Sequence, residues 1–397
     1  MVTPDTSSSR IVELDALRGL AVLGIVWMNV YVFALPLQAY YNPTVFGGES
    51  SADQFVWLAS FVFFEDKFRT LFAMLFGAGC LILIERSGEK PWRAHFARMA
   101  VLMAIGIAHS TLLASNDVLR AYALAGLAIP LLAGLTHRVL YVVAIGLVAV
   151  HVGAGIFVFG SAVVDSYAGR VDSDVSLWAA RRFGSDEGAL SYALELGREG
   201  LGERIIRRLE SLPGQLTTIT ASIPLNLAAM ALGMAMWKDR MLAGQWRIFK
   251  LQRIAAICAL IALPSLLMLA YWAQAGGFAP AFVGAASLVF SAPFDTLLGF
   301  AYAALAMAFF APGGIVTQRL AAVGRLSLTN YLMTSVVLAA IFASWGLGMF
   351  AQVSRAQAFV ISFAPIVAML IWSPLWLKQL GQGPFERLWR WSAARFS

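Results

Sequence analysis

The chain has 397 residues, of which 60% are hydrophobic and only 13% are charged. A soluble chain carries about 25% charged residues, so this sequence lacks the polar surface that a globule in water needs. The composition therefore argues against an ordinary soluble enzyme and predicts a polytopic membrane protein. The net charge of +7 could suggest nucleic-acid binding. The positions of the basic residues, described below, argue against that class as well.

Long apolar stretches recur along the whole chain. Because about 20 apolar residues span a bilayer, they predict an all-α membrane bundle of about ten transmembrane helices. The stretch 55–84 carries four ionisable residues near its middle, so it predicts either one tilted helix or a re-entrant turn followed by a shorter span. The ten predicted spans lie near 12–35, 55–84, 99–114, 118–136, 139–162, 216–236, 254–275, 282–310, 326–344 and 358–377.

Most basic residues fall on one side of this predicted bundle. With the N-terminus in the cytoplasm, the inside segments hold 18 of the 29 lysines and arginines, whereas the short outside loops hold only Arg120 and Arg355. This asymmetry follows the positive-inside rule and predicts that both termini are cytoplasmic. It also predicts a multi-pass protein, with the lipid bilayer and not a nucleic acid as its partner. The sequence leaves a homodimer open.

The chain reads as a single integral membrane domain over 1–397, with two segments that differ from the rest. The hydrophilic stretch 163–215 predicts a long external or re-entrant amphipathic connector, because its second half has helical periodicity. A lid over a binding site is the alternative for this stretch. The closing segment 378–397 alternates aromatic residues with arginine, which predicts a cytoplasmic interfacial helix.

Polar residues interrupt the first apolar stretch, LDALRGLAVLGIVWMN. Charged groups inside a bilayer helix cost about 2.5–3.5 kcal/mol each, even on the lenient insertion scale. Asp15 and Arg18 lie three residues apart and can form an ion pair, and Arg18 is also suited to hold a phosphate. Asn29 lies deeper, where its amide serves either as an interhelical hydrogen bond or as part of a site.

The second apolar stretch contains the run FEDKFR. Glu65 and Arg69 are four residues apart and are expected to pair on one helix face. Asp66 and Lys67 then need partners on other helices, so part of this run is expected to line a cavity. We therefore expect the ionisable groups of the first four spans to converge on one hydrated chamber.

The sequence GIAHSTLLASND places a histidine close to an acid. His109 lies near the outer end of its predicted helix, and Asp117 opens the next one after a tight turn. Asp117 or Asn116 also suits a helix N-cap. A neighbouring carboxylate can fix the tautomer of an imidazole, so His109 is a candidate general base as well as a candidate buried structural group.

Further polar groups occur later in the chain, but no established catalytic motif does. Asp295 lies within an apolar span, and Asn330 in GRLSLTNYL either bridges helices or binds a ligand. No HExxH, GxSxG, Walker or dinucleotide-binding motif is present, and no Cys/His cluster has metal-ligand spacing. These absences disfavour ATP-driven transport, zinc proteolysis and serine hydrolysis, and no metal is predicted.

Five segments together resemble one known family. RIVELDALRGLAVLGIVWMNV, KFRTLFAMLFGAG, GIAHSTLLASNDVLRAYAL, GRLSLTNYL and SPLWLKQLGQGPFERLWR occur in the order found in the YeiB-like bacterial inner-membrane proteins, a domain of unknown function (418). The opening segment also resembles a broader transmembrane acyltransferase superfamily that includes heparan-alpha-glucosaminide N-acetyltransferase. Members of that superfamily move an acyl group from cytoplasmic acyl-CoA to an acceptor on the far side of the membrane.

The superfamily resemblance implies roles for two residues of the first helix. Arg18 would lie near the CoA phosphates, and Asn29 matches the active-site asparagine. The lysosomal enzyme has its histidine in the loop after the first helix, but the corresponding stretch 38–48 of this chain contains none. His109 is therefore the substitute candidate.

Two functions follow from these features. In the first, the protein is an acyltransferase with acyl-CoA or acetyl-CoA as donor and a small-molecule or glycan acceptor. His109, Asp117 and Asn29 are then catalytic, and the binding residues are Asp15, Arg18, Glu65, Lys67, Arg69 and Asn330. In the alternative, the protein is a proton-coupled transporter of a small or lipid-linked compound, with the intramembrane carboxylates as its relay.

Overall fold

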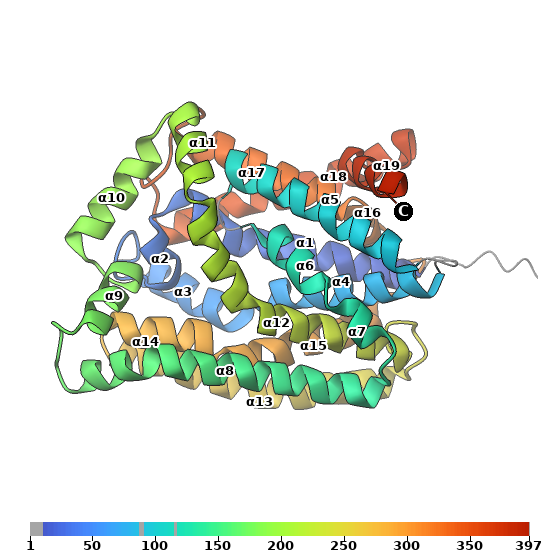
Figure 1. Cartoon of the computed structure of the whole chain (residues 1–397), viewed down its shortest axis with the longest axis horizontal. Coiled ribbons are helices and arrows are strands. Elements are labelled where there is room, and N and C mark those ends of the chain that lie inside the picture. The colour runs from blue at the N-terminus through green and yellow to red at the C-terminus, as the bar shows by residue number, and fades with distance from the viewer. Residues whose placement is uncertain (1–10, 87–90, 115–116, 397) are drawn as a thin grey trace, which may run out of the picture.

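The computed structural model describes residues 11–86, 91–114 and 117–396. These residues form helices joined by short connections, with no β-strand in the described ranges. Figure 1 shows the helices as one elongated bundle. In chain order they are α1 (Val12–Ala34), α2 (Leu37–Tyr41), α3 (Ser51–Phe63), α4 (Lys67–Arg86), α5 (Pro91–Leu112), α6 (Val118–Gly126), α7 (Ile129–Ala133), α8 (His137–Tyr167), α9 (Asp174–Phe183), α10 (Glu187–Arg198), α11 (Leu201–Glu210), α12 (Leu212–Lys238), α13 (Ile248–Ala275), α14 (Pro280–Ala285), the π-helix η1 (Ala286–Phe290), α15 (Ala292–Phe309), α16 (Ile315–Arg325), α17 (Ser327–Phe342), α18 (Arg355–Leu380) and α19 (Pro384–Phe396).

The membrane-spanning elements are fewer than the ten predicted. Within the described residues, eight are long and apolar enough to cross a membrane, and the bent pair of α16 and α17 would make a ninth. The difference arises at 118–136, where the expected single span is two short helices, α6 and α7. Figure 1 shows α6 and α7 leading the chain back along the bundle from the end of α5 to the start of α8.

The bundle has two distinct ends. Figure 1 places the start of α1 and the C-terminal helix α19 together at one end, hereafter the α19 end. The helices α9, α10 and α11 lie toward the opposite end, hereafter the α10 end. The predicted connector 163–215 thus consists of the last residues of α8, three short helices and the start of α12. The predicted tail from 378 begins slightly early, because α18 continues to Leu380 before α19 starts.

The outer surface of the bundle is apolar, as a lipid-facing surface requires. Helices α8 and α13 show this most clearly, because large side chains such as Phe157, Leu260 and Met268 stay at least 71% exposed. Other elements are interior. Tyr122 on α6 is fully buried, although its helix is too short to span a bilayer. The core of the protein therefore contains short, broken helices enclosed by long apolar ones.

Three breaks interrupt the central elements. The predicted span 55–84 is one 36-residue element that breaks between α3 and α4, where Asp66 has a φ of +59°. The span predicted at 282–310 begins with α14 and the π-helix η1 before α15 starts. Helices α16 and α17 meet at a bend of 80°, and α16 occupies a stretch where the sequence predicts no span. Irregular backbone at this depth is tolerated only where protein or a water-filled cavity surrounds it.

Helices α1 and α16 pack with almost no space between their backbones. A Cβ atom on Gly19 would lie 2.0 Å from the carbonyl oxygen of Leu320, and one on Gly324 would lie 1.9 Å from that of Asp15. Only glycine allows so close an approach, which is a common device for helix contacts in membranes. The polar start of α1 is thereby fixed against α16.

Candidate functional site

The candidate base His109 lies on the last turn of α5 and is hydrogen-bonded to the acid that the sequence predicts. Its Nδ1 is 2.8 Å from Oδ1 of Asp117, and the two side chains are 1% and 0% exposed. Asp117 also caps α6 by accepting a hydrogen bond from the amide of Arg120, at 3.0 Å. With Nδ1 donating to the carboxylate, Nε2 is left as the hydrogen-bond acceptor and potential base.

Helix α17 supplies a hydroxyl to the other side of the imidazole. Oγ of Ser335 lies 2.9 Å from Nε2 of His109, while the Tyr331 hydroxyl donates to Oδ1 of Asp117 over 3.3 Å. The resulting order of carboxylate, imidazole and hydroxyl is the arrangement that acyl-transferring enzymes use. No sequence signal points to Ser335, because it lies far along the chain from His109 and belongs to no motif.

The surroundings of Asp117 hold the carboxylate in place. A Cβ on Gly106 would lie 2.7 Å from Oδ2 of Asp117, so a glycine is needed where α5 passes the start of α6. The Arg120 guanidinium lies 3.7 Å from the same oxygen and donates to Oε1 of Gln215 on α12 over 2.7 Å. The acid is therefore oriented from several sides, which a residue that positions a base requires.

A second buried polar cluster lies at the break between α3 and α4. Nζ of Lys67 is 2.7 Å from Oδ1 of Asp295 on α15 and also donates to the carbonyl of Phe61. Glu65 is only 4% exposed, and its Oε1 has no hydrogen-bond partner among the described residues. Two carboxyl groups thus face one ammonium in the interior of the bundle.

The pair expected between Glu65 and Arg69 does not form. Arg69 instead contacts Asp66 at 2.7 Å and donates to Oδ1 of Asn226 on α12 at 3.0 Å. The physical reason is the chain break, because the positive φ of Asp66 removes the helical spacing that would bring residues 65 and 69 together. The Tyr122 hydroxyl donates to the carbonyl oxygen of Arg69 over 2.9 Å, so α6 touches both buried clusters.

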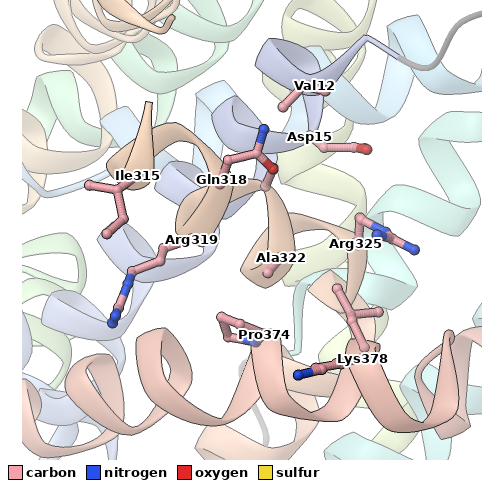
Figure 2. Close-up of a pocket in the computed structure, with 11 residues that line it drawn as sticks. Val12, Asp15, Ile315, Gln318, Arg319, Ala322, Arg325, Pro374 and Lys378 are labelled. Carbon is pink, nitrogen blue, oxygen red and sulfur yellow. The ribbon is translucent and has the colours of Figure 1, made fainter. Parts of the chain in front are cut away.

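The third polar group lies at the α19 end, where Asp15 and Arg18 form the predicted ion pair at 3.2 Å. Beside it is a cavity of about 400 Å³ between α1, α16 and α18. Figure 2 shows Asp15 and the basic side chains of Arg319, Arg325 and Lys378 around this cavity. Its lining does not include Arg18.

The two remaining predicted residues lie apart from these clusters. Asn29 is half-buried, and no hydrogen bond from its side chain joins it to the described residues around His109. Asn330 is fully buried and donates to the carbonyl of Val323 and to Oγ of Ser373, so its amide joins α17 to α16 and α18. These contacts correspond to the first of the two alternatives for Asn330, that it bridges helices. The second alternative, that it binds a ligand, stays a prediction.

The ionisable residues thus form three groups, whereas the sequence pattern predicts one chamber. Neither the cavity at the α19 end nor a smaller one at the α10 end is lined by His109, Glu65 or Lys67. Within the described residues, no group of three or more His, Cys, Asp or Glu side chains could hold a metal ion.

The fold and these buried polar groups define the class of the protein, a multi-pass helical membrane protein with polar groups enclosed in its interior. Residues 236–395 match the family described as protein of unknown function (DUF418). The chain is 30% identical to the uncharacterized protein YeiB of Escherichia coli (strain K12) over 389 residues, which are 96% of this chain and 95% of that protein. The chain therefore belongs to the DUF418 family, which also contains YeiB.

Other comparisons agree with this assignment. The uncharacterized protein YxaH of Bacillus subtilis (strain 168) is 28% identical over 403 residues, covering 98% of this chain and 95% of that protein. An uncharacterized 39.9 kDa protein from the amylase 3' region of Bacillus acidopullulyticus is 32% identical over 127 residues, or 31% of this chain and 34% of that protein. No solved structure matches. The YeiB-like resemblance stated from the sequence is thus confirmed.

Proposed function

We propose that the protein is a membrane-bound acyltransferase that moves an acyl group from cytoplasmic acyl-CoA to an acceptor hydroxyl or amine at the outer side. The observation that carries the proposal is the hydrogen-bonded series of Asp117, His109 and a hydroxyl. In it, Asp117 orients the imidazole, and Nε2 of His109 faces an O–H group at 2.9 Å. A base in this position can remove the proton from an acceptor as that acceptor attacks a thioester, which contributes about 10²–10⁴ in rate.

In this proposal Ser335 marks the position of the acceptor. Its hydroxyl has a second partner within reach, because Oγ is 3.5 Å from the carbonyl oxygen of Tyr331 one turn earlier in α17. A rotation of the serine side chain toward that carbonyl would free Nε2 for the substrate hydroxyl. Attack on the thioester then gives the acyl ester or amide and releases the CoA thiolate, which takes the proton from His109.

The donor would enter at the α19 end, which the positive-inside rule makes cytoplasmic. There the side chains of Arg319, Arg325 and Lys378 line a cavity large enough for part of a nucleotide. Guanidinium groups suit phosphate recognition because they donate two parallel hydrogen bonds. We assign this cavity to the CoA phosphates, with Arg18 nearby on the same helix as Asp15.

Helix α1 connects the proposed donor cavity with the region of the base. Its first turns border the cavity, and it also packs against α16 and α17, the helix of Ser335. Asn29 is eleven residues beyond Arg18, or about 16 Å along the helix axis. In the proposal its amide hydrogen-bonds the thioester oxygen as negative charge develops there. That role comes from the superfamily resemblance.

Entry of the acceptor requires movement at the α10 end. The last turn of α5 is covered by α11, whose Arg208 donates to the carbonyl of Thr111 over 3.4 Å. Burial, together with the neighbouring charges of Arg204 and Arg207, lowers the pKa of the Arg208 guanidinium to about 10. A buried guanidinium beside two other arginines is unfavourable, so the contact of Arg208 with Thr111 is weak. We therefore propose that α11 moves away from α5 to give the acceptor access to His109.

The experiment uses the full-length protein in nanodiscs with radiolabelled acetyl-CoA. We expect release or transfer of the acetyl group by the unaltered protein and its loss in His109→Gln. His137→Gln is the matched control, because His137 lies at the start of α8, away from the site. Unchanged turnover in His109→Gln, with an intact fold, would remove His109 from the mechanism. Absence of both turnover and CoA binding in the unaltered protein would overturn the proposed function.

Donor binding is tested separately by calorimetry with CoA. We expect the double variant Arg319→Gln/Lys378→Gln to weaken CoA binding roughly tenfold or more, since each lost charge-assisted contact is a large share of such affinity. Arg253→Gln is the control, because it removes a positive charge from the start of α13 outside the cavity. Pantetheine, which lacks the phosphates, is expected to bind equally to all three proteins.

A second function is favoured by one observation, the buried Glu65 beside the ion pair of Lys67 and Asp295, because Oε1 of Glu65 has no hydrogen-bond partner among the described residues. Intramembrane carboxylates in such surroundings are typical of proton relays. Proton-coupled transport predicts pH-gradient-dependent uptake into liposomes without acyl-CoA, and its loss in Glu65→Gln. Glu187→Gln, at an exposed position on α10, is the control. Turnover of acetyl-CoA together with no gradient-dependent uptake would favour the acyltransferase.

A further inference from the structure

A second cavity, of about 230 Å³, lies at the α10 end and is formed by α2 and α9. Figure 1 shows these two helices close together at that end of the bundle. The cavity is distinct from the His109 cluster and from the basic cavity at the α19 end. It is lined by Leu37, Gln38, Trp178, Arg181 and Arg182.

The cavity contains a buried acceptor that the protein leaves without a partner. Gln38 is only 6% exposed, and its Nε2 donates to the carbonyl oxygen of Arg181 over 3.2 Å. Its Oε1 is buried and has no hydrogen-bond partner among the described residues. A buried carbonyl oxygen without a donor is unfavourable. A hydroxyl or N–H group of a bound molecule would satisfy it.

The same cavity presents two positive charges that no described carboxylate neutralises. Arg181 and Arg182 follow each other at the end of α9 and are exposed, and neither forms an ion pair within the described ranges. Other arginines of this segment behave differently, since Arg170 contacts Asp165 at 2.5 Å and Arg207 contacts Glu199 at 2.7 Å. Uncompensated, adjacent guanidinium groups suit a carboxylate or a phosphate.

The walls of the cavity are partly apolar and are joined to each other by ring contacts and hydrogen bonds. Trp178 keeps 39% of its surface exposed, while its ring meets that of Phe159 edge-on with centroids 5.2 Å apart. Asn42 on the α2 side donates to the carbonyls of Phe183, at 2.7 Å, and Phe278, at 3.0 Å. These bonds fix the end of α9 against α2. A preorganised site of this kind loses little entropy when it binds a ligand.

We infer that this cavity binds a small anionic molecule that also carries hydroxyl groups, such as a sugar acid or a sugar phosphate. The anionic group would contact Arg181 and Arg182, a hydroxyl would donate to Oε1 of Gln38, and an apolar ring face would lie on Trp178. The headgroup of an anionic phospholipid such as phosphatidylglycerol has the same chemistry. The site does not depend on the proposed acyl transfer, and its occupant is bound whether or not acetyl-CoA is consumed.

The test is calorimetric titration of the full-length protein in phosphatidylcholine nanodiscs with glucuronate, with glucose 6-phosphate and with glucose. We expect saturable binding of at least one of the two anions. Uncharged glucose is expected to bind at least about tenfold more weakly than that anion. Arg181→Gln/Arg182→Gln and Gln38→Leu are each expected to reduce anion binding about tenfold. Arg198→Gln is the control, because this exposed arginine of the same segment lies outside the cavity.

A second arm distinguishes the two sources of the ligand. Nanodiscs containing phosphatidylglycerol are expected to suppress sugar-anion binding if a lipid headgroup occupies the site, and to leave it unchanged if the natural ligand is soluble. Either result supports an anion site. Two results would overturn the inference. The first is equal anion binding by Arg181→Gln/Arg182→Gln and by the unaltered protein. The second is no saturable binding of either anion, together with no enrichment of phosphatidylglycerol over phosphatidylcholine around the protein. Melting temperatures of all variants show that the fold is retained.

Discussion

Nζ of Lys67 lies 2.7 Å from Oδ1 of Asp295, and both side chains are almost completely excluded from the surface, at 1% and 2% exposure. The pair joins α4 to α15 at the point where the long element of α3 and α4 breaks. A carbonyl on the third turn of α3, that of Phe61, accepts another hydrogen bond from the same ammonium. The charge of Lys67 thereby holds three helices together around a break in the backbone.

The first prediction concerns the two ends of this ion pair. Removing one partner of a buried pair costs about 3–5 kcal/mol, because a charge is left uncompensated. Lys67→Met is expected to reach that range, because it leaves both Asp295 and Glu65 without a cation. Asp295→Asn is expected to cost clearly less, because Glu65 is within electrostatic reach of Lys67 and can replace the lost carboxylate. Thermal and chemical unfolding in detergent measure the difference. Equal losses in the two variants would contradict the role given to Glu65.

Contacts between polar residues could be predicted from the sequence only where the two residues lie close together along the chain. The contacts between Asp15 and Arg18 and between His109 and Asp117 were predicted, because each pair lies within one helix or across one tight turn. The partner of Lys67 could not be identified, since Asp295 belongs to a distant helix. The pairing of Arg69 with Glu65 was wrong for a different reason. Helical spacing holds only in an unbroken helix, and nothing in the sequence placed a positive φ at Asp66.

The number of membrane spans could likewise be predicted only in part from the sequence. Apolar length identified the eight long elements but also suggested a full span at 118–136, where α6 and α7 are short and most of α6 is buried among other helices. A buried helix and a lipid-facing helix are equally apolar, so composition cannot separate them. The two basic residues assigned to outside loops, Arg120 and Arg355, are likewise buried, at 4% and 0% exposure. Their charges are thus accommodated by protein groups.

The second prediction concerns the contact of α1 with α16. Gly19→Ala would place its Cβ within 2.0 Å of the Leu320 carbonyl oxygen, so one helix must move. Because Leu320 is followed by cavity residues Ala321 and Ala322, we expect a loss of stability together with altered CoA binding at the α19 end. Gly146→Ala is the control, because a Cβ there meets no atom within 4 Å. Gly19→Ala with the stability and CoA affinity of the unaltered protein would show that the two helices separate freely.

The third prediction concerns the C-terminal helix. Glu386 on α19 caps α17, because Oε1 accepts from the amides of Leu328 and Thr329 at 2.8 and 3.0 Å, and Oε2 accepts from the Thr329 hydroxyl at 2.5 Å. A carboxylate at a helix N-terminus contributes up to about 2 kcal/mol when it is partly buried. Glu386→Gln is therefore expected to lower the free energy of unfolding by about 1–2 kcal/mol.

Helix α19 also reaches the helix of His109, since Nε1 of Trp389 donates to the carbonyl of Arg98 over 3.2 Å. The same helix therefore contacts both α5 and α17, which carry His109 and Ser335. We expect Glu386→Gln to reduce turnover as well as stability. Glu187→Gln, which removes an exposed carboxylate from the first turn of α10, is the matched control for unfolding and for acetyl transfer. A stability loss in the control as large as that in Glu386→Gln would rule out a specific cap.

The last prediction separates the two roles that a hydroxyl beside a base can have. If Ser335 only occupies the place of the acceptor, Ser335→Ala frees Nε2 of His109 and changes turnover by less than about tenfold, whereas His109→Gln loses about 10²–10⁴. If Ser335 carried the acyl group itself, both variants would lose activity to the same extent. Intact-mass measurement after exposure to acetyl-CoA adds an independent readout, because an acetylated serine would appear as a stable adduct. We expect no adduct and an active Ser335→Ala protein, since the Ser335 hydroxyl can turn to the carbonyl of Tyr331 when the acceptor enters.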